Sequence, residues 1–128
     1  MNRLRVLILS EKSTDIAAWN KEVTCTFNYD FYHLADYHLL AHKKNEGEPV
    51  LLSFREGEYL IALPLLLRPV AQVEGLEFSN CWDATSVYGY AGPIFSHYDV
   101  PDSVIKEFQE EIKQYLHERK VVAVFSRL

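Results

Sequence analysis

Residues 49–69 read PVLLSFREGEYLIALPLLLRP, and this stretch decides the fold class. Its two short apolar runs are typical of buried strands, and the Gly57 region between them predicts a tight antiparallel hairpin. Nearly every residue of the second run, 59–67, is apolar, so we expect other elements to cover both faces of that strand. Pro64 has no amide hydrogen for the ladder, so we predict a bulge or a bend there.

The residues before the hairpin predict one strand and two helices. Residues 4–9 form a short apolar run that indicates a buried strand. A helical pattern of apolar residues follows, with Ser13 or Thr14 as its expected cap. A second helical pattern comes after the aromatic residues 27–32, and we expect Gly47 to end it in a left-handed C-cap.

The residues after the hairpin end in a helix and a strand. Residues 102–119 carry an apolar stripe at helical spacing, with Asp99 as a candidate cap. Residues 121–125, VVAVF, indicate a strand that is apolar on both faces. Between hairpin and helix, 77–79 and 86–91 give only weak strand signals. This order predicts an α/β (α+β) fold, a mixed and partly antiparallel sheet flanked by helices, and it excludes an all-helical bundle.

Length, charge and cysteine content limit the function further. A chain of 128 residues predicts a single domain. Its 13 Lys and Arg against 18 Asp and Glu give a net charge of −5, which argues against direct nucleic acid binding. Cys25 and Cys81 do not have the spacing of a zinc site or a disulfide framework. No apolar run approaches the ~20 residues that cross a bilayer, and no signal peptide is evident, so we expect a cytoplasmic protein without a transmembrane segment.

The most unusual segment is YGYAGP at 88–93, which combines aromatic rings with small residues that let a ligand approach the backbone. We take four of its residues as candidates for binding a substrate: Tyr88, Gly89, Tyr90 and Gly92. The alternative is a tight connection whose glycines permit unusual backbone angles and whose tyrosines pack on the sheet. Trp82 and Asp83 are further candidates in the same cleft, against the alternative of a packed indole and a turn-forming carboxylate.

No residue pattern identifies catalytic groups, a metal site or a cofactor. His38 and His42 have helical spacing for one metal ion but lack a third ligand, which favours surface or half-buried histidines. GxSxG, Walker A and GxGxxG motifs are absent. We therefore predict no catalytic residue, no metal and no cofactor for this chain.

The predicted order of elements resembles the first five strands of the fold shared by GNAT N-acyltransferases. In that family, a glycine-rich loop at a helix N-terminus binds the pyrophosphate of acyl-CoA, and residues 72–77, QVEGLE, match this loop only in part. Four segments together resemble the N-terminal half of FemAB-like proteins, the relatives of peptidoglycan bridge-forming aminoacyltransferases. They are GEPVLL at 47–52, IALPLLLRP at 61–69, YGYAGP at 88–93 and VFSRL at 124–128.

This resemblance implies that residues 1–128 form one GNAT-like N-terminal lobe, incomplete at its C-terminus, within a longer two-lobe chain. Such enzymes transfer an aminoacyl group from aminoacyl-tRNA to an amine of a bacterial cell-wall precursor, and we expect the first lobe alone to be inactive. By analogy, residues 88–93 would border the acceptor cleft and Arg68 would meet an anionic group of the substrate. The expected partner is the missing C-terminal lobe or a second copy of the chain, which would also cover residues 121–125.

Two other functions remain open from the sequence. One is a non-catalytic module that binds a small ligand or a protein through the aromatic residues at 88–93. The other is a stand-alone GNAT acetyltransferase that uses acyl-CoA, although the incomplete phosphate loop disfavours it.

Overall fold

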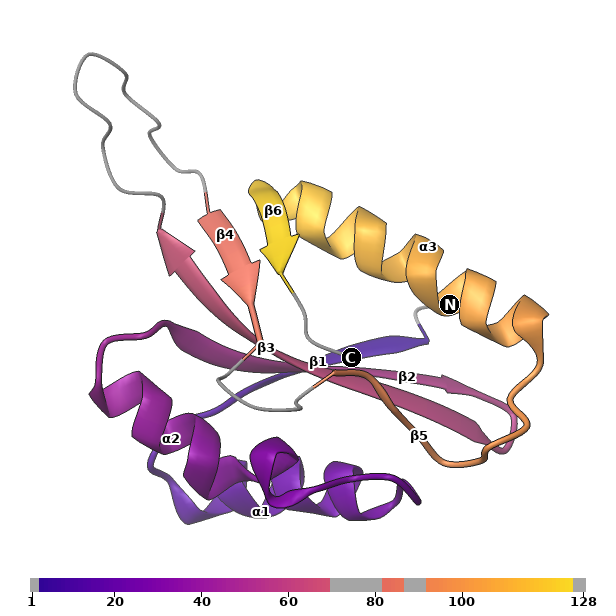
Figure 1. The fold of residues 1–128 in the computed structure, drawn as a ribbon, viewed down its shortest axis with the longest axis horizontal. Coiled ribbons are helices and arrows are strands. Elements are labelled where there is room, and N and C mark those ends of the chain that lie inside the picture. Colours follow the sequence, from indigo (N-terminus) through magenta and orange to yellow (C-terminus); the bar gives the residue numbers. More distant parts are fainter. Residues whose placement is uncertain (1–2, 70–81, 87–91, 126–128) are drawn as a thin grey trace.

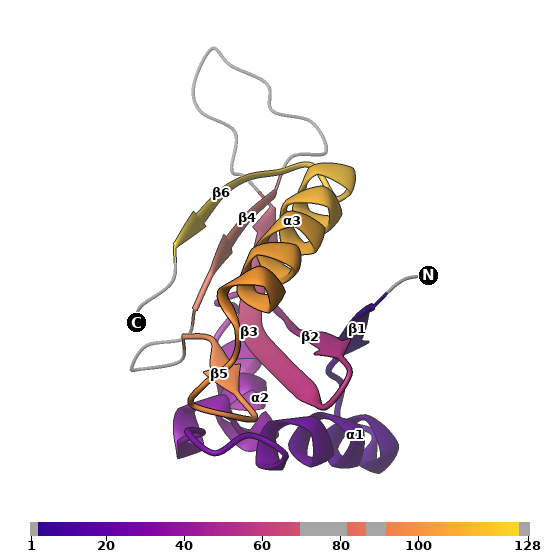
Figure 2. The same ribbon diagram turned by 90° about the vertical axis from the view of Figure 1, so that its right-hand side faces the viewer.

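The computed structural model describes residues 3–69, 82–86 and 92–125, which form a mixed sheet with helices on both faces (Figures 1 and 2). The strands are β1 (Leu4–Ile8), β2 (Glu48–Glu56), β3 (Tyr59–Pro69), β4 (Trp82–Thr85), β5 (Ile94–Phe95) and β6 (Val121–Phe125). The helices are α1 (Ser13–Thr24), the short 3₁₀ helix η1 (Phe31–His33), α2 (Ala35–Lys43) and α3 (Asp102–Glu118). The predicted α/β class is confirmed, and strands lie within the predicted ranges 4–9, 50–54, 59–67 and 121–125. The predicted burial of the strand at 4–9 is wrong: β1 is the last strand of the described sheet on that side, and Ile8 on it is 64% exposed.

The sheet is antiparallel except at one pair of strands. Its order is β1-β2-β3-β4-β6, with β5 pairing with β3 beside this path. Strands β4 and β6 are parallel, and helix α3 lies on the connection between them. Such a parallel pair needs a crossover connection, which α3 provides. Helices α1 and α2 lie on one face of the sheet, and α3 lies on the other (Figure 1). None of the described helices is long and apolar enough to span a membrane.

The β2–β3 hairpin is the centre of the sheet, and it accommodates Pro64 without a bulge. The hairpin turns at Gly57, whose φ of +59° is a conformation that glycine adopts at low cost. Amide directions alternate along a strand, and the amide of Leu60 points away from β2, since it donates to Ser96 Oγ at 2.8 Å. The backbone nitrogen of Pro64 also points away from β2, because Pro64 is four residues after Leu60. Pro64 lies between the part of β3 that pairs with β5 and the part that pairs with β4. No donor is needed there, so the predicted bulge is wrong and the register with β2 continues past Pro64.

Both faces of β3 are covered, as the sequence predicted. One face packs against α3, where Phe54 of the neighbouring strand meets Phe108 with ring centroids 5.8 Å apart. The other face packs against α1 and α2, where the buried indole of Trp19 lies in the same core as Leu51 and Ala62. Burial of each large side chain contributes about 1.5–3 kcal/mol, so the two cores hold the helices on the sheet.

Three predicted helix caps are wrong. Helix α1 begins at Ser13 itself, and no side chain caps it. Helix α3 likewise has no side-chain cap, so Asp99 does not fill that role. Helix α2 ends at Lys43, and the left-handed residue after it is Asn45, with φ +60°, and not Gly47.

Gly47 is instead required by close packing against β3. Its φ is +144°, and a Cβ atom there would lie 2.9 Å from the Cβ of Leu66. The glycine therefore lets the chain leave α2 and enter β2 directly beside the neighbouring strand.

The strand β4 was missed in the sequence. Residues 82–85, WDAT, contain the turn-forming Asp83. The sequence therefore indicated a turn with a packed indole at this place, as the alternative to a ligand site. In the structure they form a strand between β3 and β6, because neighbouring strands on both sides supply the hydrogen bonds. The weak strand signals at 77–79 and 86–91 fall outside the described residues, apart from residue 86.

Candidate functional site

The segment after α1 and the segment that leads into β5 are tied together by backbone hydrogen bonds. The amide of Phe27 donates to the carbonyl of Phe95 at 3.0 Å, and the amide of Phe95 donates to Asn28 Oδ1 at 2.8 Å. This contact brings residues 27–34 against residues 92–96. Gly92, one of the predicted substrate-binding residues, therefore lies beside a segment that is distant in sequence.

His33 fixes the position of Gly92. The imidazole is buried, its Nδ1 accepts from the amide of Asp30 at 2.9 Å, and its Nε2 lies 3.0 Å from the carbonyl of Gly92. Because Nδ1 is an acceptor, the proton is on Nε2 and is donated to Gly92. Burial lowers the pKa of His33, which favours this neutral form. His33 was not predicted as a site residue. A signal for it exists in the sequence, because Asp30 and His33 have the three-residue spacing of a capping box.

His38 is more deeply buried than the sequence predicted. Its side chain is fully inaccessible, and its ring centroid lies 4.9 Å from that of Trp19. Nε2 donates to the carbonyl of Tyr32 at 2.9 Å, whereas Nδ1 has no hydrogen-bond partner in the described part of the chain. Desolvation lowers the pKa of His38 to about 4. His42, by contrast, is exposed and contacts the carbonyl of Gly47, so the two histidines do not form a common site.

Three aromatic side chains in the segment that leads to His33 are exposed, and we call them the aromatic surface: Phe27, Tyr29 and Phe31. Between 42% and 59% of each residue is accessible. The ring of Phe31 also packs on that of Tyr32, with centroids 4.0 Å apart. Exposed aromatic groups of this kind offer stacking to a ligand or a partner. The aromatic residues 27–32 were noted in the sequence only as a linker between helices.

The remaining predicted site residues lie elsewhere on the sheet. Arg68 and Asp83 are register partners on β3 and β4, and the guanidinium holds the carboxylate through two hydrogen bonds of 2.8 and 3.1 Å. Trp82 is half-buried, with the guanidinium of Arg119 5.9 Å from its ring centroid. Along β3, Arg68 is six residues from Ala62, which pairs with Ile94, so this group is about 20 Å from the β5 region.

The structure therefore brings Arg68, Trp82 and Asp83 together but does not place them with Gly92. Tyr88, Gly89 and Tyr90 lie outside the described residues. Their role in binding a substrate stays a prediction.

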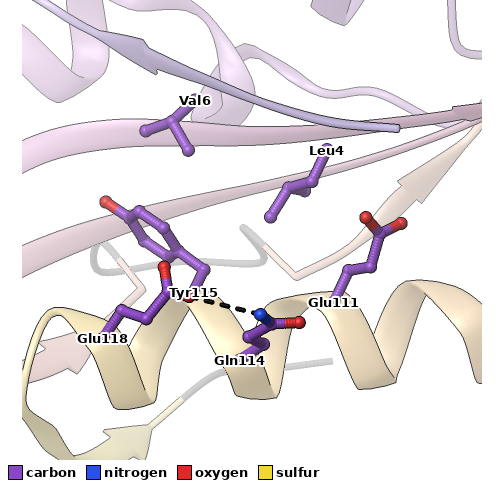
Figure 3. Close-up of a pocket in the computed structure, with 6 residues that line it drawn as sticks. All are labelled: Leu4, Val6, Glu111, Gln114, Tyr115 and Glu118. Atoms are coloured by element: carbon purple, nitrogen blue, oxygen red, sulfur yellow. Dashed lines mark hydrogen bonds between the residues drawn. The ribbon is translucent and has the colours of Figure 1, made fainter. Parts of the chain in front are cut away.

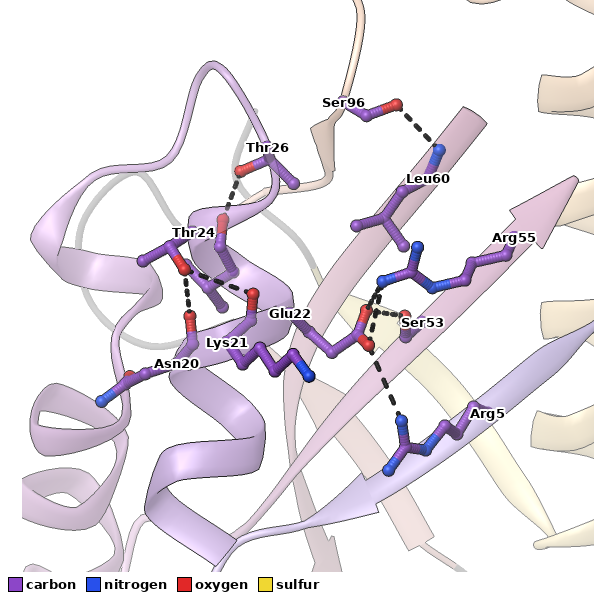
Figure 4. A network of polar contacts seen from close by, with 11 residues as sticks. Arg5, Asn20, Lys21, Glu22, Thr24, Thr26, Ser53, Arg55, Leu60 and Ser96 are labelled. Atoms are coloured by element: carbon purple, nitrogen blue, oxygen red, sulfur yellow. Dashed lines mark hydrogen bonds and ion pairs between the residues drawn. The ribbon is translucent and has the colours of Figure 1, made fainter. Parts of the chain in front are cut away.

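A buried carboxylate that the sequence analysis did not single out lies under the end of α1 (Figure 4). Glu22 accepts from Ser53 Oγ at 2.9 Å and from Arg55 Nη2 at 2.9 and 3.1 Å, and Arg5 Nη1 lies 3.7 Å away. Its side chain is only 7% exposed. With both oxygens held by donors, Glu22 joins α1 to β1 and β2, and it is not available as a general base.

Comparison with models of known protein families finds no match, and searches among curated proteins and among solved structures find none either.

Proposed function

We propose that this chain is the N-terminal GNAT-like lobe of a FemAB-like cytoplasmic enzyme that transfers an acyl or aminoacyl group to an amine. The observation that supports the proposal most is the strand order. Four strands in the order β1-β2-β3-β4 are antiparallel, and β6 then joins β4 in parallel after helix α3. The first five strands of the acetyltransferase fold follow this order, and the four sequence segments described above narrow the resemblance to FemAB-like proteins.

The acceptor in this proposal is an amine, such as that of a cell-wall precursor peptide. Its nitrogen attacks the carbonyl carbon of the activated ester, the bond from that carbon to the ester oxygen breaks, and the nitrogen loses a proton. The lobe contributes cleft walls that position the acceptor, and the aromatic surface, in the segment whose His33 binds Gly92, supplies stacking groups for it. In this proposal the other lobe supplies the base that takes this proton.

The start of helix α3 argues against acyl-CoA as a donor bound by this lobe. A helix N-terminus binds phosphate when its amides are free and no like charge is nearby. Here Asp102 occupies the first turn of α3, and Asp99 is three residues earlier. Two carboxylates at this place repel a pyrophosphate.

The partner in this proposal is a second lobe or a second copy of the chain beside β6. Strand β6 pairs with β4, and among the described residues no strand lies on its other edge. Val124 on this strand is 42% exposed. An apolar edge strand of this kind is a template for further strand pairing.

The proposal is tested first on the coding sequence after Leu128, which should continue in frame into a second lobe. The longer product should then transfer a labelled amino acid from aminoacyl-tRNA to a precursor peptide. Phe27→Ala and Tyr90→Ala should raise KM for the acceptor, whereas Gln109→Ala, on the exposed side of α3, should leave it unchanged. A stop codon at once, or no transfer by the longer product, contradicts the proposal.

The aromatic surface also favours a second candidate, a non-catalytic module that binds a peptide or a small ligand. It predicts ligand binding that Phe27→Ala weakens, without transfer from any donor. The third possibility, a stand-alone acetyltransferase, requires micromolar binding of acetyl-CoA in calorimetry.

A further inference from the structure

A cavity of about 180 Å³ lies between strand β1 and helix α3, on the sheet face opposite to α1 and α2 (Figure 3). It is lined by Leu4, Val6, Glu111, Gln114, Tyr115 and Glu118. At ~30 Å³ for each water in the liquid, its volume corresponds to about six water molecules, which is room for a small organic ligand. Nothing in the transfer reaction proposed above uses this cavity.

One end of the cavity has an excess of negative charge. Glu111 Oε2 is buried and accepts no hydrogen bond within the described residues, and its ion-pair partner Arg3 is 3.6 Å away through Nε. The same guanidinium also binds Glu56, and it donates to Glu107 at 2.7 Å. One cation among three carboxylates leaves two negative charges uncompensated, and a buried carboxylate oxygen without a donor is costly.

The other end of the cavity is formed by Glu118 and Tyr115. Glu118 accepts from Gln114 Nε2 at 3.2 Å and forms no ion pair in the described part of the chain. The hydroxyl of Tyr115 accepts from Arg119 Nη1 at 3.1 Å, and burial raises the pKa of this phenol, so the hydroxyl stays neutral. This end therefore has the carboxylate of Glu118 and a neutral hydroxyl, with the Arg119 guanidinium on the far side of that hydroxyl.

The wall that β1 contributes between the two ends is apolar, and Gln114 lies opposite to it on α3. Glu111 and Glu118 are two helical turns apart on one side of α3, which separates their backbones by about 10 Å along the helix axis. Figure 3 shows Leu4 and Val6 across from them, on the strand that faces the helix. A ligand that fits this arrangement is positive at both ends and apolar in the middle.

We propose that this cavity binds an aliphatic diamine, with one ammonium at Glu111, the other at Glu118, and the methylene chain against Leu4 and Val6. Each ammonium makes a charge-assisted hydrogen bond of ~2.8 Å to its carboxylate. The first bond supplies Glu111 Oε2 with the donor that it lacks. The methylene chain replaces water at the two apolar side chains.

Isothermal titration calorimetry with cadaverine tests this proposal. Two ligands of similar length serve as comparisons, n-pentylamine with one charge and 1,5-pentanediol with none. Cadaverine should bind more tightly than the monoamine, and the diol should not bind. Glu111→Gln and Glu118→Gln should each weaken cadaverine binding by about tenfold, the effect of losing one partly exposed charge-assisted hydrogen bond. Both substitutions preserve side-chain shape, and circular dichroism checks that each variant folds.

Glu110→Gln is the matched control, because it removes the same charge from the exposed side of the same helix. Its affinity for cadaverine should equal that of the unaltered protein. The proposal is overturned if cadaverine does not bind at millimolar concentration. It is equally overturned if Glu110→Gln weakens binding as much as Glu111→Gln, since the diamine would then be a counterion of the whole helix.

Discussion

Acidification should destabilise the protein because His38 is neutral in the folded state. Burial lowers its pKa from an ordinary value of about 6.5 to about 4. The unfolded chain therefore binds more protons than the folded chain between these two values, and the stability due to this difference is complete above about pH 6.5. It is lost as the pH falls toward 4.

The magnitude follows from the size of the shift. At ~1.36 kcal/mol for each pKa unit, His38 accounts for about 2 kcal/mol of stability lost between pH 7.5 and pH 5, and about 3 kcal/mol when the pH falls below 4. His33 contributes in the same direction, since burial lowers its pKa too. Carboxylates add their own pH dependence, so the test compares variants.

Urea unfolding at pH 7.5 and at pH 5 measures the effect in the unaltered protein, in His38→Gln and in His117→Gln. Glutamine can still donate to the carbonyl of Tyr32 but does not titrate. The free energy of unfolding of His38→Gln should therefore depend less on pH, by about 2 kcal/mol over this interval. His117 is exposed on α3, and its replacement is the control for the loss of a histidine elsewhere in the chain. Equal pH dependence in His38→Gln and the unaltered protein would refute the reasoning.

Three further predictions concern stability. Phe108→Ala should lower the free energy of unfolding by about 3–5 kcal/mol in urea titrations, because it leaves a cavity in the core between α3 and the sheet; a loss below 1 kcal/mol would contradict this packing. Gly47→Ala should cost about 1–3 kcal/mol, since φ there is +144° and the new Cβ would meet Leu66, and an unchanged melting temperature would disprove the close approach. Arg68→Ala should cost at most about 1 kcal/mol because its ion pair with Asp83 is partly exposed, and a larger loss would mean that this pair supports the sheet.

The sequence identified every element whose pattern is repeated over many residues. The stripe of α3 and the apolar runs of β2 and β3 were predicted because the periodicity of a helix or a buried strand is a local property. The predictions of the helix caps were wrong because a shift of one residue at a helix end changes which side chain is adjacent to the free amides. Strand β4 was not predicted because Asp83 favours a turn locally. Pairing with the neighbouring strands β3 and β6 makes residues 82–85 a strand.

The candidate site was less predictable than the fold. Gly92 was named for its small size, but its contact with His33 joins residues 59 positions apart, which no local pattern contains. Arg68 and Asp83 were named separately, and their pairing follows from the register of β3 with β4. Glu22 was not singled out, since a carboxylate among helical residues indicates an exposed surface until its partners on β1 and β2 are known.

By itself, the sequence determined the fold class, the central hairpin and the amphipathic helix α3, since each depends on the spacing of apolar residues along a short segment. The tertiary structure alone decided how Pro64 fits at the change of partner from β5 to β4, how His33 holds Gly92, and how two carboxylates of α3 face an apolar strand. These features arise where distant segments meet. The energy of a hydrogen bond or an ion pair depends on the partner and on burial, which exist only once the chain has folded.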